Sequence, residues 1–234
     1  MFDAIAGRYD LLNRVLSGGQ DRRWRARAIA ALNLNGRETV LDLCTGTADL
    51  ALAATNGPTR AKRVIGVDFA AAMLHLGQAK VRGAGPAEAA GGPGISFVRG
   101  DATHLPLRDA TIDAVTIGFG IRNVQDPARA CREIARVLKP DGRLAILELS
   151  LPRTAFVRSF YLWYSRWVLP LIGRAISGHA SAYTYLPASV EAFLSPDAFA
   201  QLLRDCGFSA VRADPLTMGV VYLFVATKGD SGAV

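Results

Sequence analysis

The sequence predicts an α/β fold with a Rossmann-like, mostly parallel sheet of seven strands, in which the last strand runs antiparallel. Short apolar runs alternate with helical patterns from residue 40 to residue 149, and βα units of this length favour a parallel, right-handed arrangement. The chain has 234 residues, of which 50% are hydrophobic and 20% are charged. Such a composition is typical of a globular domain with a sizeable core.

We expect one domain over residues 1–234, divided into four parts. Residues 1–35 show helical spacing of apolar side chains and predict a helical cover. Residues 36–150 carry the alternating units and predict a ligand-binding core. Residues 151–194 form an aromatic-rich cover, and residues 195–234 predict one helix followed by two strands.

The charge pattern leaves several partners open. The net charge is +7, which suits nucleic acid, an anionic membrane surface, or solubility alone. A helix expected from about residue 21 to 32 carries four of the basic side chains, and we interpret them as a solvated face: Arg22, Arg23, Arg25 and Arg27. The first ten residues lack the apolar core of a signal peptide, so we expect a cytoplasmic protein.

The cysteines and histidines predict neither disulfides nor a metal site. The three cysteines are far apart and odd in number, which favours a reduced setting. The three histidines are isolated from one another and from the cysteines. These residues are Cys44, Cys131, Cys206, His75, His104 and His179.

The stretch 40–50 predicts a strand, a tight turn and the start of a helix. Such a unit places backbone N–H groups beside a ligand at the carboxyl end of the sheet. A dinucleotide site would need glycines where this turn has Cys44 and Asp49, and the Asp49 carboxylate would repel two phosphates. Asp42 and Asp49 instead suit a ligand with positive charge and hydroxyls, such as S-adenosylmethionine. A packed turn without any ligand is the alternative.

Two more acids end predicted strands. Asp68 closes the strand 63–67, about as far after Gly46 as the carboxylate that meets ribose hydroxyls in nucleoside sites. Asp101 follows the strand 95–99, where its carboxylate and the N–H of Ala102 could bind an adenine ring; an ordinary turn acid is the alternative. Residues 83–94, rich in glycine, predict a surface excursion between the two.

The fourth strand, residues 112–117, ends in an unusual loop. Gly118 opens this loop, and Arg122 and Asn123 follow on the same carboxyl edge as the acids above. A helix from about residue 127 to 138, a turn at 139–142 and a strand at 143–149 come next.

Four aromatic residues then recur at helical spacing: Phe156, Phe160, Trp163 and Trp167. Length and interspersed arginines exclude a transmembrane span. The segment is an amphipathic cover, and core packing competes with a role facing lipid or a greasy substrate. A loop is expected around residues 183–187, then a helix from Ser195 and strands near 208–213 and 220–227.

With these motifs the chain resembles the family of ubiquinone/menaquinone biosynthesis C-methyltransferases. The similarity extends from residues 2–18 to the final strands. Its most specific parts are Phe119–Val124 with Arg136–Leu144, and Tyr185–Val190. A common methyltransferase fold would share only the loop at residues 40–49.

The resemblance implies a class I S-adenosylmethionine-dependent methyltransferase that acts on a ring carbon of a prenylated quinol. It favours conversion of demethylmenaquinol to menaquinol, with benzoquinol methylation in ubiquinone biosynthesis as the alternative. It also implies roles for nine residues. Arg122 and Asn123 are expected to be catalytic, by stabilising a phenolate and by positioning a hydroxyl or water. The expected cofactor-binding residues are Gly46, Thr47, Asp68, Asp101, Ala102, Gly118 and Tyr9, the last on a lid.

One of these positions departs from the family pattern. Gly118 stands where many relatives have a serine that touches the cofactor, so that side-chain contact is lost.

The greasy substrate and the positive charge together predict peripheral contact with an anionic membrane. Two other functions stay open on the residues alone. One is a nucleic-acid methyltransferase, disfavoured because the loop at 118–123 lacks a stacking aromatic motif. The other is a basic RNA- or membrane-binding module without catalysis. A homodimer is compatible with the sequence, which does not fix the oligomeric state.

Overall fold

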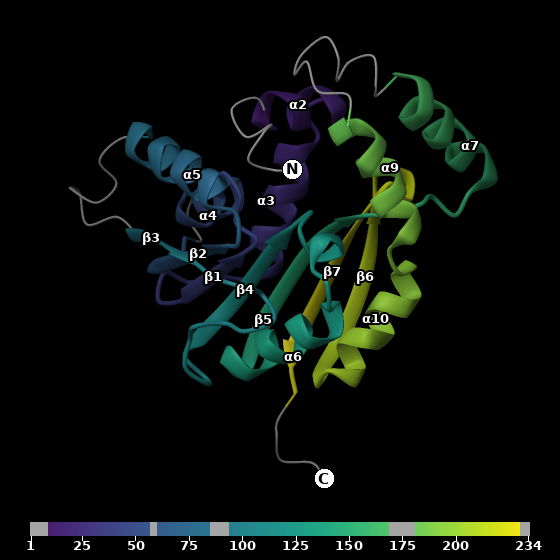
Figure 1. Cartoon of the computed structure of the whole chain (residues 1–234). Coiled ribbons are helices and arrows are strands. Elements are labelled where there is room, and N and C mark those ends of the chain that lie inside the picture. The colour runs from purple at the N-terminus through teal and green to yellow at the C-terminus, as the bar shows by residue number, and fades with distance from the viewer. Residues whose placement is uncertain (1–8, 57–59, 85–93, 169–180, 230–234) are drawn as a thin grey trace.

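A seven-stranded sheet forms the centre of the computed structural model, which describes residues 9–56, 60–84, 94–168 and 181–229. The strand order is β3-β2-β1-β4-β5-β7-β6, and β7 runs antiparallel to both of its neighbours (Figure 1). The mostly parallel sheet with an antiparallel last strand is therefore confirmed. The strands are β1 (Thr39–Leu43), β2 (Arg63–Asp68), β3 (Gly94–Arg99), β4 (Ile112–Gly118), β5 (Leu138–Leu149), β6 (Phe208–Leu216) and β7 (Val221–Lys228).

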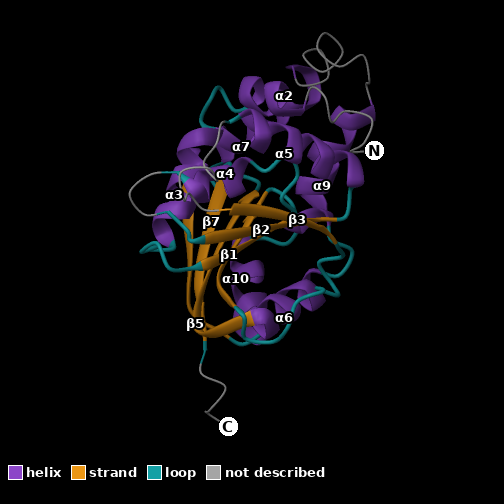
Figure 2. Ribbon diagram, turned by 90° about the vertical axis from the view of Figure 1, so that its left-hand side faces the viewer, coloured by secondary structure: helices purple, strands orange, loops and turns teal. Residues whose placement is uncertain are grey.

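Helices cover both faces of the sheet and its carboxyl edge. Helices α3, α4 and α5 pack on one face and α6 and α10 on the other, and Figure 2 shows α3 and α6 on opposite sides of the strands. Helices α2, α7 and α9 lie beyond the upper end of the strands in Figure 1. The bounds are α2 (Tyr9–Leu16), α3 (Asp21–Ala31), α4 (Asp49–Thr55), α5 (Ala71–Gly83), α6 (Pro127–Val137), α7 (Ala155–Trp163), α9 (Ser181–Ala192) and α10 (Pro196–Asp205).

The central strands are buried on both faces, which explains why they read as continuous apolar runs. Leu41 contributes to the core under α6 and α10, whereas its neighbour Val40 contributes to the core under α3 and α4. Helix α4 approaches the sheet closely because it presents small side chains to it, such as Ala51 and Ala54, both fully buried. Each face therefore has its own hydrophobic core.

The order of the strands fixes the place of a ligand site. Strand β1 pairs with β2 on one side and with β4 on the other, so the chain leaves the centre of the sheet in both directions. Ligands in open α/β sheets bind in the crevice that this reversal leaves at the carboxyl ends of the strands. The loops after β1, β2 and β4 all end at that edge.

The structure corrects the prediction of a loop at residues 183–187, because these residues belong to α9, which continues through Pro187. Helix α9 packs on the turn η2 (Ile121–Asn123), and this tertiary contact favours the helix. The structure corrects the turn predicted at 139–142, because these residues belong to β5, which begins at Leu138. The partners of β4 shift there from Leu138 to Arg143. The predicted excursion falls largely on residues 85–93, which lie outside the described residues.

The aromatic segment forms α7 followed by a single π-helical stretch, η3 (Tyr164–Val168). Its four spaced aromatic side chains face outward in the structure. The exposed fractions are 83% for Phe156, 60% for Phe160, 54% for Trp163 and 68% for Trp167. Core packing therefore does not explain them. Within the described ranges, every helix is too short or too polar to span a bilayer.

Candidate active site

A cavity of about 680 Å³ opens at the carboxyl ends of β1, β2 and β4. Its volume suits a nucleoside-sized ligand. Six of the nine predicted site residues line it: Gly46, Asp68, Asp101, Ala102, Gly118 and Asn123. Thr47 and Arg122 lie beside the cavity without lining it, and the side chain of Tyr9 is outside what the structure describes.

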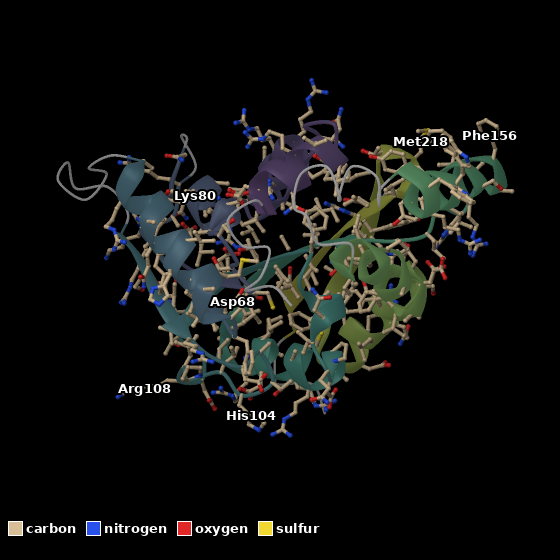
Figure 3. All side chains as sticks on the ribbon, turned by 45° about the horizontal axis from the view of Figure 1, so that its top comes forward. Asp68, Lys80, His104, Arg108, Phe156 and Met218 are labelled. Carbon is tan, nitrogen blue, oxygen red and sulfur yellow. The ribbon has the colours of Figure 1, made fainter. Side chains whose placement is uncertain are left out.

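Asp68 extends from the end of β2 toward the turn after β1, and Figure 3 shows it near the middle of the molecule. One carboxylate oxygen accepts a hydrogen bond from the N–H of Gly46 at 2.8 Å, and the other accepts from the N–H of Ala70 at 2.9 Å. An ionised carboxylate is an acceptor only, and this one lines the cavity at the end of β2. Phe69, 70% exposed, offers an apolar ring at the rim of the same cavity.

Asp101 forms a short turn at the other end of the cavity. Its carboxylate accepts hydrogen bonds from the N–H of Thr103 at 2.8 Å and from the hydroxyl of Thr103 at 2.9 Å. These two donors hold the pKa of Asp101 below its ordinary value. The group is therefore an ionised acceptor at neutral pH, and the adjacent Ala102 is buried against the hydrophobic core.

Asp42 of β1 binds the turn that follows β1, and it is only 1% exposed. Its carboxylate accepts from the hydroxyl of Thr45 at 2.5 Å, the hydroxyl of Thr116 at 2.8 Å and the N–H of Ala51 at 3.1 Å. The carboxylate also lines a small pocket beside the cavity, together with Gly46 and Gly118. Its role is to tie β1, β4 and α4 together under the turn.

Burial gives Asp42 a measurable pH signature, because it raises the pKa of the carboxyl from 3.8 to about 6. The folded chain thus binds this proton more tightly than the unfolded chain does, so the stabilisation is complete below pH 3.8 and is lost as the pH rises through 6. We expect a loss of about 3 kcal/mol in the free energy of unfolding between about pH 4 and pH 7. Urea titrations across this range should show a flatter profile for Asp42→Asn, and parallel profiles would contradict the account.

Asp49 is held in a network of charges and does not point into the cavity. Lys80 of α5 donates to the Asp49 carboxylate at 2.8 Å and to the hydroxyl of Thr47 at 3.1 Å, and it also forms an ion pair with Asp10 of α2. Thr47 donates to Asp10 at 2.6 Å, and Arg25 pairs with Asp49 at 3.0 Å. The network fastens α2 and α3 over the turn, so Asp49 is already neutralised and Arg25 is not a solvated side chain as predicted.

Arg122 is buried in an ion pair with Glu148, the penultimate residue of β5. The guanidinium donates to Glu148 at 2.7 Å, to the carbonyl oxygen of Phe119 at 2.5 Å and to the hydroxyl of Ser189 at 3.3 Å. The next residue, Asn123, lines the cavity. The pair therefore lies directly behind the cavity wall.

Two glycines in the same loop allow close packing. A Cβ atom at Gly118 would lie 2.7 Å from Cδ1 of Leu50, so a serine there would have to displace Leu50. A Cβ atom at Gly120 would overlap the Cβ of Cys44, which has a left-handed backbone with φ of 55°.

We expect Gly120→Ala to lower the free energy of unfolding by about 1 to 3 kcal/mol, because the added methyl group overpacks the loop. Gly83→Ala is a matched control, since nothing lies within 4 Å of its added Cβ. Chemical denaturation of both variants measures the difference. Equal stability of Gly120→Ala and the unchanged protein would refute the close approach.

Sequence reasoning missed Glu148, Lys80 and Ser189. A signal existed for Glu148, because it ends a strand at the carboxyl edge as Asp68 does. Nothing in the sequence distinguishes Lys80 from the other basic residues of its helix, and Ser189 acquires its contact only through the packing of α9.

A family model described as the ubiE/COQ5 methyltransferase family matches residues 1–228. The chain belongs to the ubiE/COQ5 methyltransferase family. A ubiquinone/menaquinone biosynthesis C-methyltransferase of Syntrophotalea carbinolica is 46% identical, with 99% of this chain and 94% of the relative covered. The demethylmenaquinone methyltransferase of Thermus thermophilus is 44% identical, with 97% of this chain and 100% of the relative covered.

A solved structure supports the fold of this ubiE/COQ5 family member. An S-adenosylmethionine-dependent methyltransferase of Thermotoga maritima has a TM-score of 0.65 and 19% identity, with 97% of each chain covered. The class I fold expected from the sequence is thereby confirmed, and the enzyme uses S-adenosylmethionine. The observed lining fits this cofactor, because the cavity places the carboxylates of Asp68 and Asp101 at two strand ends, beside the turn at Gly46.

Proposed function

We propose that this enzyme transfers a methyl group from S-adenosylmethionine to a ring carbon of a prenylated quinol, with demethylmenaquinol as the preferred acceptor. The observation that carries the proposal is the 44% identity to the demethylmenaquinone methyltransferase of Thermus thermophilus over that protein's full length. The cavity supports it, because it combines acceptors for a nucleoside with a second wall formed by Phe119, Asn123 and Val124.

Residues at different strand ends are proposed to bind different parts of S-adenosylmethionine. Asp68 is proposed to accept the ribose hydroxyls, and Asp101 with Ala102 to bind the adenine ring. The turn at Gly46 and the backbone of Gly118 are proposed to hold the methionine end. Thr47 acts through its hydrogen bond to Asp10, which fastens α2 over the turn.

The chemistry requires an electron-rich ring carbon beside an electrophilic methyl group, which the bound sulfonium supplies. Asn123 lines the cavity and is proposed to position the ring hydroxyl or a water. Arg122 stays protonated at neutral pH and cannot take the hydroxyl proton. The hydroxyl proton passes to water, as does the proton of the ring carbon once the methyl group has bonded there. The positive charge of Arg122, behind the cavity wall, is proposed to stabilise the developing phenolate, while the cavity aligns the reacting atoms.

Methyl transfer from a labelled donor to two separately supplied quinols tests the proposal. Label should enter demethylated naphthoquinol faster than demethylated benzoquinol. Faster labelling of the benzoquinol would show that the preferred acceptor is the benzoquinol of ubiquinone biosynthesis. Labelling of neither quinol, by protein that binds S-adenosylmethionine, would refute quinol methylation.

The outward face of α7 supports peripheral contact with an anionic membrane. Tyr161 of α7 is half-buried, whereas the four aromatic side chains named above are exposed. Figure 3 shows Phe156 projecting at the same corner of the view as Met218, which is 73% exposed. Amphipathic helices of this kind bind the interface through aromatic side chains and through attraction of basic residues to anionic lipid.

Flotation with vesicles that contain phosphatidylglycerol measures this contact. We expect salt-sensitive binding that falls severalfold when Phe160 and Trp163 are both replaced by serine. Leu194→Ser is the matched control, because Leu194 is also an exposed apolar residue but lies between α9 and α10. Equal vesicle binding by the aromatic variant and the unchanged protein would show that α7 does not contact the membrane.

A further inference from the structure

Glu148 is a buried carboxylate that no part of the mechanism above uses. Its side chain is 1% exposed and that of Arg122 is 6% exposed. The carboxylate accepts from the Arg122 side chain at 2.7 Å, from the backbone N–H of Arg122 at 3.2 Å and from the N–H of Leu149 at 2.8 Å. A charge so deeply buried is stable only when paired and hydrogen-bonded, so these contacts fix a single geometry.

The geometry extends from Glu148 into the wall of the cavity. Glu148 binds both the backbone and the side chain of Arg122, which belongs to the short turn Ile121–Asn123. Asn123, the next residue of that turn, faces the cavity. The guanidinium also reaches the hydroxyl of Ser189, whose own hydrogen is donated to the carbonyl of Leu186. The Arg122–Glu148 pair thus joins the turn Ile121–Asn123 to both β5 and α9.

We propose that Glu148 is a positioning residue for methyl transfer, which holds Arg122 and, through the turn, Asn123 in place for the acceptor ring. The inference rests on the proposed function and deepens it. Displacing a catalytic group by about 1 Å can lower a rate about 100-fold. Glu148 does not touch the part of the cavity that holds Asp68 and Asp101, so its effect is confined to the acceptor side.

Glu148→Gln is the test, because it keeps the shape of the side chain and removes its charge. We expect kcat with the naphthoquinol to fall about 100-fold, while the dissociation constant of S-adenosylmethionine, measured by calorimetry, stays unchanged. Glu38→Gln is the matched control: Glu38 is also buried, pairs with Arg143 and accepts backbone N–H groups, but lies before β1 at the opposite edge. It should leave kcat unchanged.

A double-mutant cycle separates positioning from general support of the fold. Glu148→Gln and Arg122→Lys should each lower kcat, and the double variant should lose little more than either, because the two residues act as one unit. Additive losses, or an equal loss of turnover and cofactor affinity, would overturn the inference. Unchanged kcat in Glu148→Gln would also overturn it.

Two further outcomes are distinguishable. Should Glu148→Gln not fold, Glu148→Asp keeps the charge and shortens the side chain, and it must show the same selective loss of kcat; wild-type turnover in Glu148→Asp would overturn the inference. If the unchanged protein methylates no quinol, the proposed function fails, and the inference fails with it.

Discussion

Replacing Arg122 by alanine is expected to lower the free energy of unfolding by about 3 to 5 kcal/mol, because the buried carboxylate of Glu148 is left without its partner. Both side chains are almost fully buried, so the carboxylate of Glu148 is left in a poorly solvated site. Turnover should fall as well, since the variant loses the positive charge beside Asn123. Urea denaturation gives the stability, and assays on the folded fraction give the turnover.

Arg212→Ala is the control for this variant. Arg212 pairs with Asp214, but its side chain is 64% exposed and that of Asp214 is 40% exposed, and ion pairs of this kind contribute about 0 to 1 kcal/mol. Adding Glu148→Gln to Arg122→Ala should restore part of the stability by removing the unpaired buried charge. A loss of stability for Arg122→Ala no larger than that for Arg212→Ala would contradict the buried pair.

Replacing Asp68 by alanine is expected to weaken binding of S-adenosylmethionine by about 1 to 3 kcal/mol, which is about a 5- to 150-fold rise in the dissociation constant. The variant removes the proposed acceptor of the ribose hydroxyls and also frees the N–H groups of Gly46 and Ala70. Titration calorimetry measures the change, and kcat at saturating cofactor should be nearly intact.

Asp113→Ala is the control for a lost carboxylate. Asp113 lies near the start of β4, and its side chain accepts from the N–H of Thr39 at 2.8 Å and from Lys139 at 2.6 Å. It belongs to the amino edge of the sheet, so cofactor affinity should not change. Equal affinity in Asp68→Ala and in the unchanged protein would remove Asp68 from the cofactor site.

The cofactor side of the site could be predicted because its determinants are local. Asp68 and Asp101 each end an apolar strand, and parallel strands bring their carboxyl ends to one edge. The same reasoning could not predict the partners of Asp42 and Asp49, because the sequence does not show which side chains the fold brings to a carboxylate. Asp42 is satisfied by Thr116 from the neighbouring strand, and Asp49 by Lys80 from another helix.

The acceptor side could be predicted only in part. The Arg122–Asn123 pair was identified, but its partner Glu148 is 26 residues away, and the contact depends on how β4 pairs with β5. Likewise Pro187 suggested a loop, whereas packing on the turn Ile121–Asn123 favours a helix there. Such tertiary contacts override local propensity.

A crystal structure of the protein with S-adenosylhomocysteine bound is the most direct test of the central claim, which is that the cavity between β1, β2 and β4 holds the methyl donor. The account predicts the ribose hydroxyls on Asp68, the adenine ring beside Asp101 and Ala102, and the sulfur directed toward Asn123. Ligand density outside this cavity, or a ribose that makes no contact with Asp68, would contradict it.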